Sequence, residues 1–386
     1  MAQKKILLFT GGGLAPALNA TLFGAISAAK QHGYSVWGGF SGWKSLLPKG
    51  QLIDLSDLDI TPIKRAGGTF LRSSRTNPYG DKKNIEQIIQ KISKEKFNAV
   101  IPIGGDDTLG AAERLFREEG ISTIGIPKTI DNDLPGTYWT PGHPTAAKTL
   151  SDMVHEIRFD AAYPLQRVFI IESYGMDAGW LAASTSYGHA DIIIPPEKEV
   201  DLDNFFEIYQ NRLKNNGGFA VIVVSEHARF SGGVEGECFE ESDTFQRARR
   251  HLAAVGLRKE IKNKFGQDMR IILPGNFIQT GPPSSIDGDI AEQLGEQAIN
   301  MLNNELFGQM ACVQRPDLKS NKVTTGNIPL SDVISGGNVK TLTDELFDFE
   351  NLQVKPAYLD YMEPILGKLK DPDNHYARLL QKIKTV

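Results

Sequence analysis

Short apolar segments alternate with longer amphipathic ones through the first 130 residues, and no other feature constrains the fold as much. Residues 5–10 and 98–103 have the apolar run of a buried strand, and glycines follow each. Residues 84–96 place isoleucines at i, i+3, i+4 and i+7, which is one face of a helix. Strands that alternate with helices predict a parallel sheet, covered on both faces by right-handed crossovers.

The same alternation returns later in the chain. Strand-like segments occupy residues 167–173, 219–225 and 270–273, and residues 287–302 have helical spacing. We therefore expect an α/β fold with two similar three-layer α/β domains and mostly parallel sheets. Ligands of such sheets bind outside the carboxyl ends of the strands, so the active site is expected in the cleft between the domains.

The expected domain organisation follows from these segments. Residues 1–142 together with about 279–330 form the domain that binds the phosphate donor, and residues 143–278 form the domain that binds the acceptor. Residues 331–386 are polar with scattered aromatic side chains, and we expect them to wrap around the two domains.

Composition excludes several classes of function. The net charge of −5 argues against a general nucleic-acid binder, which normally carries a basic excess. The apolar stretch near the N-terminus is interrupted by glycines, and no segment approaches the roughly 18 apolar residues of a membrane span. The expectation is a cytoplasmic protein with neither a nucleic-acid nor a membrane partner.

Three glycines, Gly11, Gly12 and Gly13, separate the first strand from the helix predicted at residues 15–31. Backbone N–H groups in such a turn can face an anion, with the helix dipole behind them. The turn has neither the Gly-Lys-Ser/Thr ending of a Walker loop nor the G-x-G-x-x-G pattern. An ordinary strand-to-helix turn is the alternative interpretation.

Two consecutive acids, Asp106 and Asp107, follow two glycines at the end of the strand at 98–103. Adjacent carboxylates are costly unless a cation or hydrogen-bond donors compensate them. The glycines let a phosphate approach, and an acid can hold Mg²⁺ directly or through water. Helix capping by Asp107 or Thr108 is the alternative, and it explains only one of the acids.

The loop at 127–133 contains Lys128, Thr129, Asp131, Asn132 and Asp133. A lysine provides positive charge for a phosphate and a threonine provides a hydroxyl donor. One aspartate can act as a general base toward a hydroxyl, while the other lies near a metal. A structural Asp-Asn-Asp turn is the alternative.

A further glycine turn, at residues 67 and 68, precedes two hydroxyl side chains and two arginines, Arg72 and Arg75. The planar guanidinium group suits phosphate oxygens. A solvated basic loop is the alternative, especially for Arg72.

Taken together and in this order, these motifs and residues 178–182 (Ala-Gly-Trp-Leu-Ala) resemble the phosphofructokinase family, from residue 5 to about 302. The resemblance implies Asp131 as the base that deprotonates the acceptor hydroxyl. It also implies that Asp106, with Asp133 nearby, serves Mg²⁺. The remaining implied contacts are Thr129 with the sugar or the transferred phosphoryl group, and Gly12, Arg75 and Lys128 with the donor.

Two positions indicate which donor is used. ATP-using members of the family normally have glycines where this chain has Asp107 and Lys128, and pyrophosphate-using members resemble this chain. A carboxylate at residue 107 would fill and charge the space of a nucleotide α-phosphate. Lys128 would instead neutralise the compact charge of pyrophosphate, so the sequence favours pyrophosphate.

The acceptor side departs from the family pattern. Tyr174, Gly175 and Met176 stand where relatives read Met-Gly-Arg, and Asn276 and Gln279 replace an aromatic residue or histidine and an arginine. Each lost charge-assisted contact is worth about 1.5–3 kcal/mol. The side chains proposed as substitutes are those of His143, His227 and Lys64.

Other acceptor residues are retained. By resemblance, Arg167 and Arg270 grip the 6-phosphate of the sugar, often from a neighbouring subunit, and Glu226 hydrogen-bonds a sugar hydroxyl. A strand-edge salt bridge for Arg167 and a turn acid for Glu226 are the alternatives.

The predicted function is a reversible, Mg²⁺-dependent phosphoryl transfer from pyrophosphate to fructose 6-phosphate. The products are fructose 1,6-bisphosphate and phosphate, as in glycolysis and gluconeogenesis, and the enzyme is expected to be a homodimer or homotetramer. A different sugar phosphate or polyol acceptor, ATP as donor, and a non-catalytic regulatory subunit are the alternatives.

Overall fold

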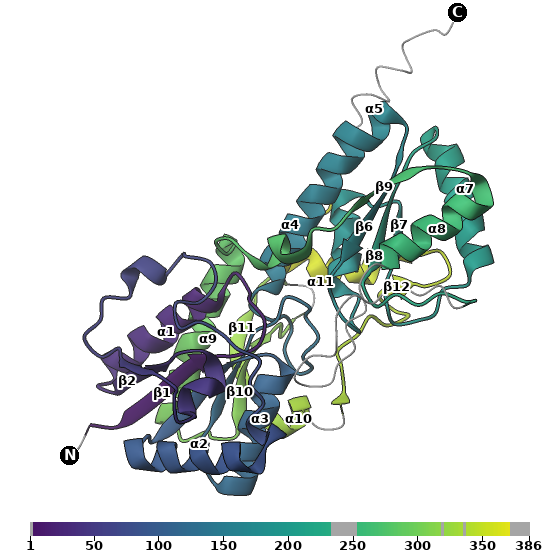
Figure 1. Cartoon of the computed structure of the whole chain (residues 1–386). Coiled ribbons are helices and arrows are strands. Elements are labelled where there is room, and N and C mark those ends of the chain that lie inside the picture. Colours follow the sequence, from purple (N-terminus) through teal and green to yellow (C-terminus); the bar gives the residue numbers. More distant parts are fainter. Residues whose placement is uncertain (1–2, 233–252, 318–319, 335–336, 371–386) are drawn as a thin grey trace, which may run out of the picture.

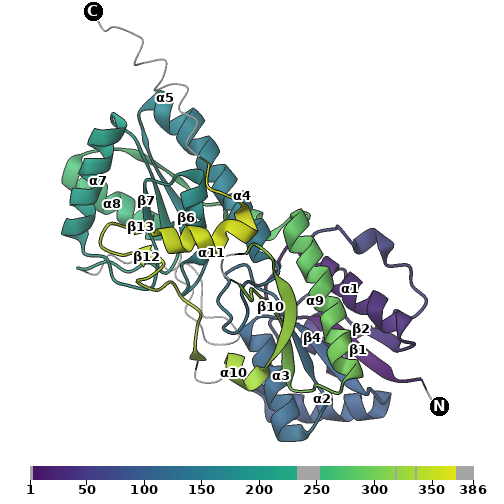
Figure 2. The same ribbon diagram turned by 180° about the vertical axis from the view of Figure 1, so that it is seen from behind.

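The computed structural model describes residues 3–232, 253–317, 320–334 and 337–370. Its two large sheets lie in two separate lobes, and helix α4 (His143–Glu156) runs from their junction along the second lobe (Figure 1). Helix α11 (Pro356–Leu366) lies against the second lobe near the same junction, as the reverse view shows (Figure 2).

The first sheet has seven strands in the order β11-β10-β5-β4-β1-β2-β3. Its central pairings are parallel, whereas β3 and β11 pair antiparallel at the two edges. The strands are β1 (Lys5–Thr10), β2 (Ser35–Gly39), β3 (Leu52–Asp54), β4 (Ala99–Gly104), β5 (Ile124–Pro127), β10 (Gln309–Gln314) and β11 (Thr324–Pro329).

Helices cover both faces of this sheet because successive side chains of a strand point to opposite sides. Ile6 and Leu8 of β1 belong to one apolar core, and Leu7 and Phe9 belong to another. Helices α1 (Leu18–Gln31) and α9 (Ser285–Asn303) contribute to the first core. The second core contains side chains of α2 (Lys82–Glu95), α3 (Asp106–Glu119) and α10 (Leu330–Ile334).

The second sheet has four parallel strands in the order β7-β8-β6-β9. They are β6 (Val168–Ser173), β7 (Ile192–Ile194), β8 (Ala220–Ser225) and β9 (Met269–Ile272). Helices α7 (Leu202–Asn216) and α8 (Ala253–Phe265) pack on one face. The other face packs against α4, α6 (Trp180–Ser184) and α11.

The predicted α/β class with two three-layer units and mostly parallel sheets is confirmed. Strands β3, β7, β10 and β11 were not predicted, and the helix expected from residue 15 begins at Leu18. The predicted division of the chain into a donor domain and an acceptor domain, with its boundaries, stays a prediction.

The C-terminal segment is ordered into short elements within its described part. They are α10, the two-stranded pair β12 (Phe347–Asp348) and β13 (Gln353–Val354), and α11. The predicted wrapping segment also includes residues 335–336 and 371–386, which lie outside the described residues. Within the described ranges, none of the helices combines the length and the apolar character that crossing a membrane requires.

Candidate active site

A cavity of about 710 Å³ lies between the two lobes, and the loops after β1, β4, β5, β6 and β8 line it. This is the place that parallel α/β sheets offer to ligands, since the carboxyl ends of their strands meet there. The predicted site residues that line it are Gly12, Arg75, Asp106, Asp107, Lys128, Thr129, Asp131, Asp133, Tyr174, Met176, Glu226, Asn276 and Gln279.

Three predicted acceptor residues do not line this cavity. Gly175 lies directly behind it and donates its N–H to Glu226 Oε1 at 3.2 Å. Arg167 and Arg270 are both exposed. Arg167 directly precedes β6 and Arg270 is the second residue of β9, and these strands are neighbours because Val168 pairs with Met269. Both arginines therefore lie away from the strand ends that form the cavity, and this chain alone does not bring them to it.

The glycine turn after β1 lies against Lys128, the residue that follows β5. Lys128 Nζ donates a 2.6 Å hydrogen bond to the carbonyl oxygen of Gly13. Gly12 has φ +82°, and a Cβ added there would lie 3.4 Å from Lys128 Nζ, so a side chain would be strained and would crowd the ammonium. The Gly12 N–H donates to Ser74 O, and the Ser73 hydroxyl donates to Gly12 O.

The two consecutive acids lie in the first turn of α3, whose N-cap is Gly105. Asp107 and Thr108 lie inside the helix and the N-cap is Gly105, so the alternative that either of them is the capping residue is wrong. Both carboxylates are instead held at the positive end of the helix dipole and face the cavity.

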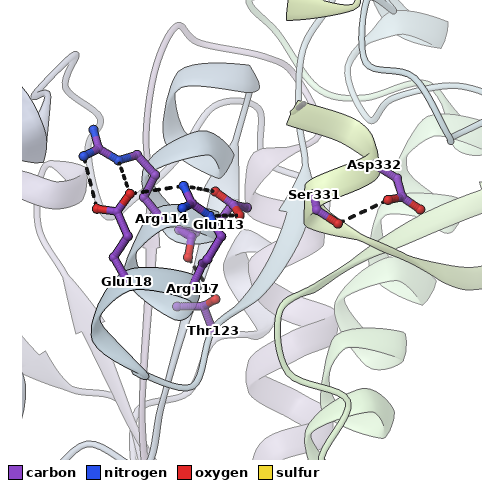
Figure 3. Close-up of polar contacts among 8 residues, drawn as sticks. Glu113, Arg114, Arg117, Glu118, Thr123, Ser331 and Asp332 are labelled. Carbon is purple, nitrogen blue, oxygen red and sulfur yellow. Dashed lines mark hydrogen bonds and ion pairs between the residues drawn. The ribbon is translucent and has the colours of Figure 1, made fainter. Parts of the chain in front are cut away.

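Helix α3 carries three ion pairs among four side chains, and two of the pairs join residues four positions apart (Figure 3). Arg114 pairs with Glu118 at 3.1 Å, and Arg117 pairs with Glu113 at 2.7 Å. Such pairs contribute only a few tenths of a kcal/mol each. The Arg114 guanidinium also lies 3.7 Å from the ring centroid of Tyr79. Both residues line a second, smaller cavity of about 330 Å³, and Asp106 and Asp107 line this cavity as well as the main one.

The loop after β5 is organised by its own side chains. Thr129 Oγ1 accepts the Asp131 N–H at 3.0 Å, and the Thr140 hydroxyl donates to Thr129 O at 2.7 Å. Asn132 has φ +56°, a left-handed conformation that asparagine tolerates better than most residues. The chain thereby turns between Asp131 and Asp133, and both carboxylates line the cavity.

The electrostatics of this loop suit proton transfer to a carboxylate. Burial, reinforced by the nearby carboxylates of Asp133 and Glu226, raises the pKa of Asp131 well above its ordinary value. A more basic carboxylate is a better general base near neutral pH. Burial also lowers the pKa of Lys128 to about 8, although Asp131 and Asp133 attract its charge.

The side chains that line the cavity suit a divalent cation that is bound partly by protein carboxylates and partly by a phosphate group of the substrate. Six carboxylates line the cavity, whereas Arg75 and Lys128 are its only lysine or arginine side chains among the described residues. Mg²⁺ prefers oxygen ligands and is often held by one or two carboxylates together with substrate phosphates. The described residues contain no cluster of three or more His, Cys, Asp or Glu side chains that could hold a metal alone. Asp106 and Asp133 therefore fit such a shared site.

The acceptor side of the cavity is held together by Glu226 and Tyr174. Glu226 is buried, and its Oε1 accepts the backbone N–H groups of Gly175 and Met176, both at 3.2 Å. The Tyr174 hydroxyl lies 3.5 Å from Asn276 Oδ1, which connects the loop after β6 to the short helix Gly275–Gln279.

Of the three substitutes considered for the missing guanidinium groups, only His227 lines the cavity. Its Nδ1 lies 3.1 Å from Asp177 Oδ1, and Asp177 lines the same cavity. His143 is fully buried against Ile130 O at 2.8 Å, and burial lowers its pKa to about 4. Lys64 is paired with Glu292 elsewhere on the first lobe.

A lysine that sequence reasoning missed contacts the loop from the C-terminal segment. Lys340 Nζ lies within hydrogen-bond distance of four acceptors, Asn132 Oδ1 at 3.1 Å, Thr137 O at 3.0 Å, Tyr138 O at 2.7 Å and the Tyr361 hydroxyl at 2.8 Å. Its three N–H groups serve three of them at a time. Burial lowers its pKa to about 7, against the attraction of Asp133. No local motif surrounds Lys340 in the sequence, so no sequence signal pointed to it.

Comparisons with known proteins find sequences and structures similar to this chain. The phosphofructokinase family profile matches residues 5–302. A pyrophosphate--fructose 6-phosphate 1-phosphotransferase of Amycolatopsis mediterranei is 32% identical over 332 residues, which cover 85% of this chain and 96% of that relative. An ATP-dependent 6-phosphofructokinase of Halothermothrix orenii is 31% identical, covering 79% of this chain and 90% of that relative.

The fold has close solved counterparts. The crystal structure of a pyrophosphate-dependent phosphofructokinase from Marinobacter aquaeolei matches with a TM-score of 0.81 at 23% identity. The match covers 95% of this chain and 92% of the other, so nearly the whole architecture is shared.

Proposed function

The chain belongs to the phosphofructokinase family, and we propose that it transfers a phosphoryl group from pyrophosphate to fructose 6-phosphate. The products are fructose 1,6-bisphosphate and phosphate, and the reaction runs in both directions. The observation that carries this proposal is the pair of side chains Asp107 and Lys128, which line one cavity with the glycine turn. Relatives named for either donor are similar to this chain, so these two positions decide between the donors.

In the proposed reaction the acceptor hydroxyl oxygen attacks the terminal phosphorus of pyrophosphate, and its proton passes to the Asp131 carboxylate. Lys128 and Arg75 hold the donor and the departing phosphate beside the glycine turn that contains Gly12. The Thr129 hydroxyl orients the group in transfer. Mg²⁺, when bound by Asp106 and Asp133 with the pyrophosphate oxygens, supplies positive charge where the phosphoryl oxygens gather negative charge.

The phosphate group of the sugar requires positive charge for binding. The acceptor side of the cavity in one chain has no arginine or lysine side chain among the described residues. Tyr174, Met176 and Asn276 line it there, and Arg167 and Arg270 lie outside it. We therefore include a homodimer or homotetramer in the proposal, in which a neighbouring copy presents these two arginines. A cytoplasmic location is part of the same proposal.

A second candidate keeps the donor and changes the acceptor. The observation that favours it is Met176, an uncharged side chain in the cavity where relatives carry an arginine. An acceptor with fewer charged groups, such as a polyol or another sugar phosphate, would need less guanidinium binding. Turnover of fructose 6-phosphate at a rate far above that of any other acceptor would eliminate this candidate.

Coupled assays with each donor test the proposal. The wild type, supplied with Mg²⁺ and fructose 6-phosphate, is expected to form fructose 1,6-bisphosphate from pyrophosphate and far more slowly from ATP. The double variant Asp107→Gly/Lys128→Gly restores the residues typical of ATP-using members and is expected to lose pyrophosphate activity and gain ATP activity. Transfer from ATP but not from pyrophosphate by the wild type would overturn the donor assignment.

A further inference from the structure

Lys340 lies in the C-terminal segment, outside the residues 5–302 that the family profile matches. Its side chain nevertheless belongs to a hydrogen-bond network beside the cavity, in which Lys340, Asn132 and Tyr361 all contact one another. The Tyr361 hydroxyl of α11 donates to Tyr138 O, and it accepts hydrogen bonds from Lys340 Nζ at 2.8 Å and from Asn132 Nδ2 at 3.3 Å. Asn132 Oδ1 in turn accepts from Lys340 Nζ. One ammonium group therefore satisfies acceptors from three segments of the chain.

The backbone of Lys340 adds two further connections. Its N–H donates to Asp133 O at 2.8 Å, and its carbonyl oxygen accepts the indole N–H of Trp180 at 2.7 Å. The ammonium also lies 5.0 Å from the ring centroid of Trp180, within the range of a cation–π contact. Trp180 begins α6 of the second lobe. Lys340 therefore connects the loop at 128–133 of the first lobe to the second lobe and to α11.

These contacts bear directly on the turn between the two loop carboxylates. Asn132 is buried and holds a left-handed backbone conformation, which costs free energy relative to the ordinary helical or extended regions. Both ends of its amide group are satisfied by the Lys340–Tyr361 pair. An amide buried without these partners would favour a different loop conformation, because unsatisfied polar groups are costly in the protein interior.

We propose that Lys340 is a positioning residue for phosphoryl transfer: through Asn132 and Tyr361 it holds the loop at 128–133 so that Asp131 and Asp133 face the cavity. Lys340 does not line the cavity, although its neighbours Gly337 and Val339 do. It therefore acts on catalysis through the loop and not through contact with pyrophosphate or the sugar.

The test compares Lys340→Met with Lys355→Met. Methionine keeps most of the length of the lysine stem and removes the ammonium. Lys355 is the matched control, because it belongs to the same segment and its Nζ donates only to Asp344 O among the hydrogen bonds that the structure gives it. In Lys340→Met we expect kcat to fall about 10- to 100-fold, while KM for pyrophosphate and for the sugar stays within about twofold.

A second readout does not depend on turnover. Amide hydrogen exchange of a peptide covering residues 128–134 is expected to become about tenfold faster in Lys340→Met and unchanged in Lys355→Met. Tyr361→Phe keeps the ring and removes only the hydroxyl that joins Asn132 to Lys340. It is expected to show the same pattern in smaller degree, and it decides the question if Lys340→Met does not fold.

Only the expected changes in kcat and KM rest on the proposed function; the expected change in hydrogen exchange does not. An inactive wild type would contradict the proposed function, and the exchange experiment would still decide the role of Lys340. An active wild type whose kcat and loop exchange are both unaltered in folded Lys340→Met, or in Tyr361→Phe, would overturn the inference. A rise in both KM values at unchanged kcat would overturn it as well, since that result indicates substrate contact.

Discussion

Lys128 Nζ donates a 2.6 Å hydrogen bond to the carbonyl oxygen of Gly13, which fixes the lysine after β5 against the glycine turn after β1. The two residues are far apart in the sequence, and the parallel pairing of β1, β4 and β5 brings them together. Neither residue alone specifies a phosphate site. Together they place a buried ammonium beside a glycine turn at the cavity, which suits a small, highly charged donor.

The activity with pyrophosphate is expected to fall above about pH 8. Burial lowers the pKa of Lys128 to about 8, so its positive charge is lost as the pH rises through that value. The parameter to measure is kcat/KM for pyrophosphate, because it reports groups of the free enzyme. Lys128→Arg stays charged at every accessible pH and is expected to remove this limb of the profile. An unchanged decline in Lys128→Arg would exclude Lys128 as its cause.

Replacing the proposed base is expected to abolish turnover while the fold is kept. Asp131→Asn removes the proton acceptor but retains the shape of the side chain, and kcat is expected to fall by about 10²- to 10⁴-fold. Circular dichroism and thermal unfolding check that the variant is folded. Asp152→Asn, on the exposed side of α4 and paired only with Lys148 in the ion pairs observed, is the matched control. Full activity in Asp131→Asn would refute the assignment.

His227 is expected to contribute to acceptor binding. It is the one considered substitute for the missing arginine that lines the cavity, and it lies 3.1 Å from Asp177. In His227→Ala we expect kcat/KM for the acceptor to fall about 10- to 100-fold, the size of one charge-assisted contact, with KM for pyrophosphate unchanged. The control is His32→Ala, at the exposed end of α1. Equal losses for donor and acceptor would argue against an acceptor role.

We expect the free energy of unfolding to decrease as the pH rises, because the buried carboxyl group of Asp287 loses its proton. Asp287 accepts the Gly142 N–H at 2.8 Å and the hydroxyl and N–H of Thr145, which ties α9 to the start of α4. Burial raises its pKa from 3.8 to about 6, so the folded state prefers the protonated form.

A folded-state pKa above the unfolded value gives stability that is complete below about pH 4 and lost as the pH rises through about 6. The shift corresponds to a loss on the order of 3 kcal/mol. Unfolding free energies at several pH values should show this loss in the wild type and not in Asp287→Asn. Asp289→Asn, an exposed acid of the same helix, should keep the wild-type profile. Parallel profiles for the wild type and Asp287→Asn would contradict the prediction.

The regular elements of both lobes were largely predictable because their patterns are local. The strand expected at residues 5–10 is β1, and the isoleucine spacing at 84–96 corresponds to α2, whose Ile85, Ile88 and Ile92 are buried. Strand β10, which lies between β5 and β11, and the edge strand β11 were missed. Both contain polar side chains, and pairing with other parts of the chain stabilises them as strands.

The candidate-site residues that come directly after a predicted strand could be predicted from the sequence. Asp106, Asp107, Lys128 and Asp131 lie directly after β4 and β5, so topology alone brings them to one edge of the sheet. The choice among three substitutes for the missing arginine was not predictable. It depends on which side chain faces the cavity, and chain position does not determine that direction.

The sequence by itself determined the fold class and the family, and it indicated the residues proposed to bind the phosphate donor, because periodicity, glycine turns and short motifs act over a few residues. Only the tertiary structure decided the rest. It placed Arg167 and Arg270 outside the cavity of their own chain, brought His227 but not His143 or Lys64 to the cavity, and brought Lys340 to Asn132 across 208 residues. Such contacts depend on how the lobes and the C-terminal segment pack, and long-range packing leaves no periodic signal in the sequence.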